Sequence, residues 1–213
     1  MRHLAYAFMV AAIAALALVA GTGCGGGGAG QPVAQTPDPG AYRGSEPPPG
    51  IQLPSFTLTD VMNGEPVSSQ DFGGRVVLVT FLDSDCHHQC PIIAREVGQA
   101  LERMPSSTRD RTTALVISVN PIVDTRASVK HFLHEQRALG QLTYLSASVA
   151  TLQPVWKAFG VVSAYETGDV DTHSADVRVF NPAGVWVSTQ DVGVDLTPAN
   201  LAADVRKALG TNG

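Results

Sequence analysis

Two cysteines that stand close together are the residues of this chain best suited to chemistry. Cys86 and Cys90 lie four positions apart in the segment Asp-Cys-His-His-Gln-Cys-Pro, residues 85–91. In a helical or near-helical turn this spacing places both sulfur atoms on one face, and thiolates at a helix N-terminus are favoured by the backbone dipole. Such a pair suits copper(I) or zinc, and it can also oxidise to a redox-active or purely structural disulfide. The spacing alone does not choose among these.

A metal site would need at least one further ligand, and residues 51–213 contain five histidines. His131 and His134 lie three apart on a predicted amphipathic helix, where a solvated face is the expected environment. His87 and His88 lie between the cysteines, but adjacent side chains point apart. His173 stands in a polar segment, residues 165–174, that reads as a loop. From residue types alone, His173, His87 and His88 all stay candidates.

Two acidic residues also flank the first cysteine. Asp83 and Asp85 are expected to be surface or capping groups rather than general bases. A negative charge at Asp85 would oppose formation of a thiolate at Cys86.

The elements that must position these residues begin with a buried strand. Residues 75–82 form an apolar, β-branched run, the pattern of a central strand buried on both faces, and it points toward Cys86. A helix over about 90–104 and a second buried strand over 113–119 follow. Together they predict a strand–helix–strand unit with a right-handed crossover.

The remaining elements complete an α/β fold. Asn63-Gly64 is a turn signal for an N-terminal hairpin, and Asp124 is expected to cap a helix. Thr197-Pro198 opens a C-terminal helix. We therefore predict a thioredoxin-like fold, with a central mixed sheet flanked by helices and an N-terminal β-hairpin extension. Its further predicted elements are strands 56–59, 65–68, 142–145, 177–180 and 185–188, and helices 124–139, 151–159 and 197–209.

The N-terminal region has the composition of a targeting segment. A positive start is followed by an uncharged apolar run, residues 4–20, and then by small residues before Cys24, which resembles a bacterial lipoprotein cleavage site. We expect residues 1–23 to be a signal peptide or membrane anchor, with lipidation at Cys24. Alternatives are an uncleaved anchor or ordinary secretion with a spare cysteine.

The segment after Cys24 differs from both of its neighbours. Residues 24–50 are rich in Gly and Pro and have few large apolar side chains, so we expect a disordered linker. Residues 51–213 are then one folded domain. The whole chain has 14 Lys and Arg against 19 Asp and Glu, a net charge of -5, which argues against a nucleic-acid partner.

The residues from about 51 to 209 resemble the Sco/SenC family, thioredoxin-fold copper-binding proteins that assist assembly of cytochrome c oxidase. In order and spacing, three stretches support the resemblance: Cys86, Cys90 and Pro91 after a buried strand; residues 118–125; and His173-Ser174 before residues 177–184. The resemblance implies a copper site with Cys86 and Cys90 as thiolate ligands and His173 as the imidazole ligand. Two thiolates and one imidazole suit copper(I), and the nitrogen also admits copper(II).

The resemblance also implies a function. It is that of a membrane-tethered copper chaperone at the extracytoplasmic face of the cell membrane, which binds one copper ion and delivers it to cytochrome c oxidase subunit II or a similar exported cuproprotein. Such a protein is a metallochaperone rather than an enzyme. The chain departs from the family pattern at His87, Gln89 and Asn120, so His87 or His88 could be an extra ligand.

Two enzymatic alternatives share the fold. A thiol–disulfide oxidoreductase would cycle Cys86 and Cys90 to reduce a partner's copper-ligand thiols. Thioredoxin-type oxidoreductases carry Cys-x-x-Cys and a cis-proline before the facing strand, whereas here three residues separate the cysteines and no proline lies between Pro154 and Pro182. A peroxidase of the peroxiredoxin kind would need Pro and Thr shortly before Cys86, and both are missing.

Overall fold

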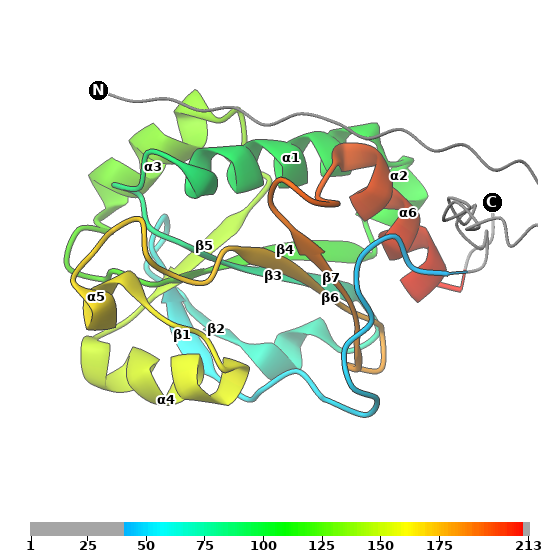
Figure 1. Ribbon diagram of the computed structural model, residues 1–213, viewed down its shortest axis with the longest axis horizontal. Helices are drawn as coiled ribbons and strands as arrows, with labels where there is room; N and C mark the ends of the chain where they lie inside the picture. The colour runs from blue at the N-terminus through cyan, green and yellow to red at the C-terminus, as the bar shows by residue number, and fades with distance from the viewer. Residues whose placement is uncertain (1–40, 211–213) are drawn as a thin grey trace, which may run out of the picture. The chain divides into compact units, whose positions relative to one another are not determined.

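The computed structural model describes residues 41–210, which contain one seven-stranded mixed sheet with helices on both faces (Figure 1). The strand order is β2-β1-β5-β4-β3-β6-β7. In chain order the elements are β1 (Thr57–Asp60), β2 (Pro66–Ser68), η1 (Ser69–Phe72), β3 (Val76–Leu82), α1 (Gln89–Arg103), α2 (Ser106–Arg109), β4 (Thr112–Ser118), α3 (Arg126–Glu135), β5 (Thr143–Ser146), α4 (Val149–Phe159), α5 (Ala164–Thr167), β6 (Asp176–Phe180), β7 (Trp186–Asp191) and α6 (Pro198–Ala208).

Strand β3 is a fully buried inner strand of the sheet. It pairs in parallel with β4 and antiparallel with β6, and all seven of its residues are buried. Because successive side chains point to opposite faces, Leu78 packs into the core under α1, α3 and α6, while Val79 and Phe81 pack into the core over α4. Figure 1 shows these helices on the two sides of the sheet. The continuous apolar run in the sequence is explained by this burial on both faces.

The predicted fold class is confirmed. The N-terminal hairpin is formed by β1 and β2, the parallel unit by β3, α1 and β4, and the second hairpin by β6 and β7. Thr197 caps α6 as expected, with its side chain accepting a hydrogen bond from the Asn200 amide. The short helices η1, α2 and α5 were not predicted.

The prediction for helix α3 was wrong at both ends. Thr125, not Asp124, is the N-cap, and its side chain accepts a hydrogen bond from the Ser128 amide. The helix ends at Glu135 rather than near residue 139, because Arg137 takes a left-handed backbone conformation (φ 56°) that no helix can continue through. Asp124 is instead a buried acceptor near the cysteines.

Residues 41–50 were expected to belong to the disordered linker, but the structure places them against the domain. The Arg43 and Gly44 amides donate to the Asp204 carboxylate at 2.6 and 3.1 Å, and Ser45 forms a bridge with Thr189. The predicted targeting segment, Cys24 and the rest of the predicted linker lie outside the described residues. Within residues 41–210 no helix is long and apolar enough to span a membrane.

Candidate metal centre

The two cysteines lie where β3 ends and α1 begins. Cys86 is in the connecting loop and Cys90 is in the first turn of α1, and the two side chains are 2% and 0% exposed. The loop is closed by Asp83, whose carboxylate accepts hydrogen bonds from the Asp85 amide at 2.7 Å and from the Asn120 side chain at 2.9 Å. Asp83 was expected to be a surface or capping group; it is fully buried, so it is not a surface group, and it caps the loop through the Asp85 amide.

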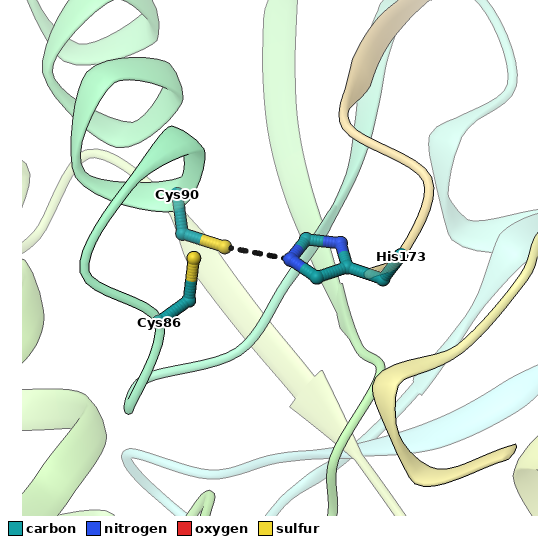
Figure 2. Close-up of side chains that lie close together, drawn as sticks. All are labelled: Cys86, Cys90 and His173. Carbon is teal, nitrogen blue, oxygen red and sulfur yellow. Dashed lines mark hydrogen bonds between the residues drawn. The ribbon is translucent and has the colours of Figure 1, made fainter. Parts of the chain in front are cut away.

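His173 reaches the cysteines from the loop between α5 and β6. Its Nε2 lies 3.2 Å from the Cys90 sulfur, and Figure 2 shows the imidazole ring pointing at the two thiols. Its Nδ1 lies 2.8 Å from the Ser174 carbonyl oxygen. A carbonyl can only accept, so Nδ1 carries a proton and, in the neutral ring, Nε2 presents its lone pair to the sulfur atoms.

The loop of His173 is itself held in place by the chain that follows α4. The Ser174 amide donates to the Val162 carbonyl at 3.0 Å, and the Val162 amide donates to the Ser174 hydroxyl at 3.1 Å. The residue after His173 is thereby fixed to the chain that follows α4 by two hydrogen bonds.

Together the three side chains form a compact donor set. The two sulfur atoms and the imidazole nitrogen all lie within 4.8 Å of one another, and among residues 41–210 no other group of three His, Cys, Asp or Glu side chains is so arranged. Two thiolates and one imidazole are soft and borderline ligands that fit copper or zinc better than magnesium or calcium. Both thiols are free rather than joined in a disulfide, so the pair is also able to take part in thiol chemistry.

The two thiols differ in acidity. A hydrogen bond from Cys90, helped by His173 and opposed by burial, lowers the pKa of Cys86 to about 4. The same hydrogen bond, together with burial, raises the pKa of Cys90 well above its ordinary value. At neutral pH the pair therefore holds one proton between two sulfur atoms, and Cys86 is the thiolate.

His173 has a raised pKa. Burial by itself lowers it, but hydrogen bonds to Cys86 and to the Ser174 carbonyl outweigh that effect. The ring therefore binds a proton more readily than a free histidine, and that proton competes with a metal ion for Nε2.

The other histidines do not join the donor set. His87 and His88 are exposed, and His88 Nδ1 lies 2.9 Å from an oxygen of Asp171. His131 and His134 are on the exposed face of α3, as expected, and His131 pairs with Glu135 at 3.3 Å.

Sequence reasoning missed the position of Asp171. Its carboxylate lies 3.6 Å from the Cys86 sulfur and also pairs with His88. Asp171 therefore joins the cysteine loop to the loop of His173. No local pattern marks it, because it stands in a polar loop with several similar residues.

Comparison with known proteins places the chain in a family. The sequence model of the SCO1/SenC family matches residues 46–210. A curated protein of Stutzerimonas stutzeri, named for copper binding, is 29% identical over 136 residues, which cover 62% of this chain and 65% of that protein's own length.

Solved structures show the same fold. Apo Sco1 from Thermus thermophilus superposes with a TM-score of 0.64 at 22% identity, covering 78% of this chain and 96% of that one. Bradyrhizobium japonicum ScoI with copper bound superposes with a TM-score of 0.61 at 29% identity, covering 75% of this chain and all of that one. Since the family model spans well over half of the sequence, the chain belongs to the SCO1/SenC family.

Proposed function

We propose that this protein is a membrane-tethered copper chaperone that binds one copper ion through Cys86, Cys90 and His173. The observation that carries the proposal is the convergence of two thiols and one imidazole nitrogen within 4.8 Å. The donor set fits copper(I), and the nitrogen also accommodates copper(II). Support comes from the relative with copper bound at 29% identity.

The proposed task is delivery. The copper ion is cargo, passed by ligand exchange to cytochrome c oxidase subunit II or a similar exported cuproprotein, and no covalent bond of a substrate is made or broken. The protein is therefore proposed to be a metallochaperone rather than an enzyme. Tethering through a lipid at Cys24, or through residues 1–23, would keep it at the extracytoplasmic face of the membrane.

The test is copper binding by the reduced full-length protein in detergent, wild type beside His173→Ala and His134→Ala. His134 is the matched control because it is an exposed histidine outside the donor set. We expect one copper per chain and a thiolate-to-copper(II) absorption band for wild type and His134→Ala. His173→Ala should lose the band and at least about 100-fold in copper(I) affinity, since even groups that only orient a ligand are worth 10–100-fold.

A second candidate is thiol–disulfide exchange, and one observation favours it. The lowered pKa of Cys86, beside a free Cys90, gives a thiolate and a resolving thiol in contact. If reduced wild type binds no copper, or if His173→Ala binds it identically, delivery is wrong in this form and cycling of the two cysteines becomes the leading function.

A further inference from the structure

Directly behind the cysteine loop lies a buried carboxylate that the proposed metal site does not use. Asp124 is 6% exposed and accepts three hydrogen bonds. One oxygen accepts from the Ser84 backbone amide at 2.8 Å. The other accepts from the Ser118 hydroxyl at 2.6 Å and from the Tyr144 hydroxyl at 2.8 Å.

The donors come from different parts of the sheet. Ser118 is the last residue of β4 and Tyr144 lies in β5. The single proton of the Tyr144 hydroxyl is shared between Asp124 and the carbonyl oxygen of Leu82, which lies 2.9 Å away. One carboxylate therefore connects the end of β4 and, through Tyr144, strand β5 to the loop that follows β3.

That loop carries Cys86. Ser84 stands two residues before it, and the Cys86 amide reaches back to the Asp83 carbonyl at 3.3 Å. Cys90 is fixed by the first turn of α1, but Cys86 precedes the helix and has no such support. Its position relative to His173, which comes from a separate loop, depends on how the segment from Asp83 to Cys86 is held.

The carboxylate is costly where it stands, which is a second reason to look for a role. Burial raises the pKa of Asp124 to about 6, against the opposing effect of its hydrogen bonds with Ser118, Ser84 and Tyr144. Burying a charged group costs free energy unless hydrogen bonds compensate for it, and here three donors serve the carboxylate.

We propose that Asp124 is a positioning residue: by binding the Ser84 amide it anchors the Cys86 loop to the end of β4 and to Tyr144 of β5, and so sets the place of the Cys86 sulfur relative to Cys90 and His173. This inference rests on the proposed copper site for its effect on affinity. Its effect on the loop is independent of any metal.

The test compares Asp124→Ala with Asp124→Asn in the reduced full-length protein in detergent. Alanine leaves the Ser84 amide without its partner, whereas the asparagine oxygen can still accept from it and its amide group can donate to the two hydroxyls. Asp204→Ala is the control. Asp204 is equally buried and accepts from the Ser188 hydroxyl and the Gln190 side chain, and none of its partners lies in the cysteine loop.

Two readouts separate positioning from general destabilisation. The first, without metal, is the alkylation rate of Cys86 by iodoacetamide, followed by mass spectrometry. The buried thiol reacts only when its loop opens, and loss of one anchoring hydrogen bond should raise the rate about tenfold. The second is copper(I) affinity by competition with a chromophoric chelator, which should fall about tenfold in Asp124→Ala.

We expect Asp124→Asn to come close to wild type in both alkylation rate and copper(I) affinity. Asp204→Ala, compared under conditions where its stability equals that of Asp124→Ala, should show neither change. Equal alkylation of wild type and Asp124→Ala would overturn the proposal. So would equal acceleration in Asp204→Ala. If wild type binds no copper the delivery function fails, but the alkylation rates still decide the role of Asp124.

If Asp124→Ala does not fold, Tyr144→Phe replaces it. This variant keeps the aromatic ring and removes its hydroxyl. That hydroxyl is one of the two that donate to the Asp124 oxygen not bound to the Ser84 amide. A smaller rise in Cys86 alkylation is expected, and a rate equal to that of wild type would contradict the proposal.

Discussion

Proton occupancy at the three proposed ligands sets how the site accepts a metal ion. Cys86 is already a thiolate near neutral pH, whereas the raised pKa of Cys90 keeps its proton in place. A metal bound through both sulfur atoms must displace that proton, and it must also displace the proton of any His173 ring that is charged. Cys86 would thus be the one ligand already free of its proton, whereas Cys90, and His173 when charged, would have to lose a proton before they could bind the metal.

Asp124 leads to a prediction about stability and pH. Its pKa is 3.8 ordinarily and about 6 in the folded protein. As pH rises the unfolded chain loses this proton first, so the folded state is favoured below about 4 and the advantage is lost by about 6. The size is roughly 3 kcal/mol. Asp124→Asn cannot ionise, so the wild-type free energy of unfolding minus that of the variant should fall by about 2–2.5 kcal/mol from pH 4 to pH 7, since part of the unfolded-state group is already ionised at pH 4.

Urea denaturation of both proteins at the two pH values measures that difference directly. All other titrating groups are shared by the two proteins and cancel in the subtraction. A difference that stays constant between pH 4 and pH 7 would show that the carboxyl of Asp124 is not perturbed by its burial.

At the scale of single residues, local sequence could identify the cysteine pair but not its partner. Cys86 and Cys90 form a recognisable spacing, whereas His173 comes from a distant loop and was singled out only by the family resemblance. Asp83 and Asp124 were taken for surface and capping groups. Their burial depends on how β3, β4 and β5 lie side by side, which no local pattern expresses.

At the scale of elements, Gly44 is the point where the N-terminal segment lies closest to the sheet. A Cβ at this position would overlap the carbonyl oxygen of Thr189 and lie 2.6 Å from the Ser188 hydroxyl. Gly44→Ala should therefore push the segment off β7 and weaken the two backbone hydrogen bonds between Ser45 and Thr189. We expect a loss of about 1–3 kcal/mol in the free energy of unfolding.

Gly73→Ala is the control for this substitution. A Cβ at Gly73 meets nothing within 4 Å, and the backbone there has φ -53°, which any residue adopts. Its unfolding free energy should stay within about 0.5 kcal/mol of wild type. Equal stability of the two alanine variants in urea would mean that residues 41–45 contribute nothing to the fold.

The same segment shows why the limit of the linker was missed. Residues 41–50 are poor in large apolar side chains, so composition placed them in a disordered stretch. They are held instead by backbone amides that meet the buried carboxylate of Asp204 and by strand-like pairing with Thr189. Backbone hydrogen bonding of this kind leaves no periodicity in a sequence. The apolar runs of β3 and β4, by contrast, could be recognised directly, because burial on both faces dictates residue type at every position.

At the scale of the whole molecule, docking of this segment bears on the proposed tether. The described chain begins beside α6, whereas α5 and the loop that carries His173 lie toward the opposite side of the domain (Figure 1). Because residues 43–45 are bound to the domain, the proposed spacer could not extend to residue 50 and would have to lie before residue 43. Any 17-residue chain spans roughly 60 Å when fully extended and roughly 20–25 Å on average when flexible.

The distance that the proposed spacer can span should therefore limit the proposed delivery of copper, but not the binding of copper to the protein. Deleting residues 25–36 shortens the spacer to a few residues, so the metal site could no longer approach a partner that stands away from the lipid surface. We expect copper affinity of the purified protein to be unchanged, and the copper content of the oxidase in cells that carry the deletion to fall. Replacing residues 25–36 with a Gly/Ser sequence of equal length should restore loading, since reach depends on length more than on sequence. Full loading with the deletion in place would show that delivery does not depend on this spacer.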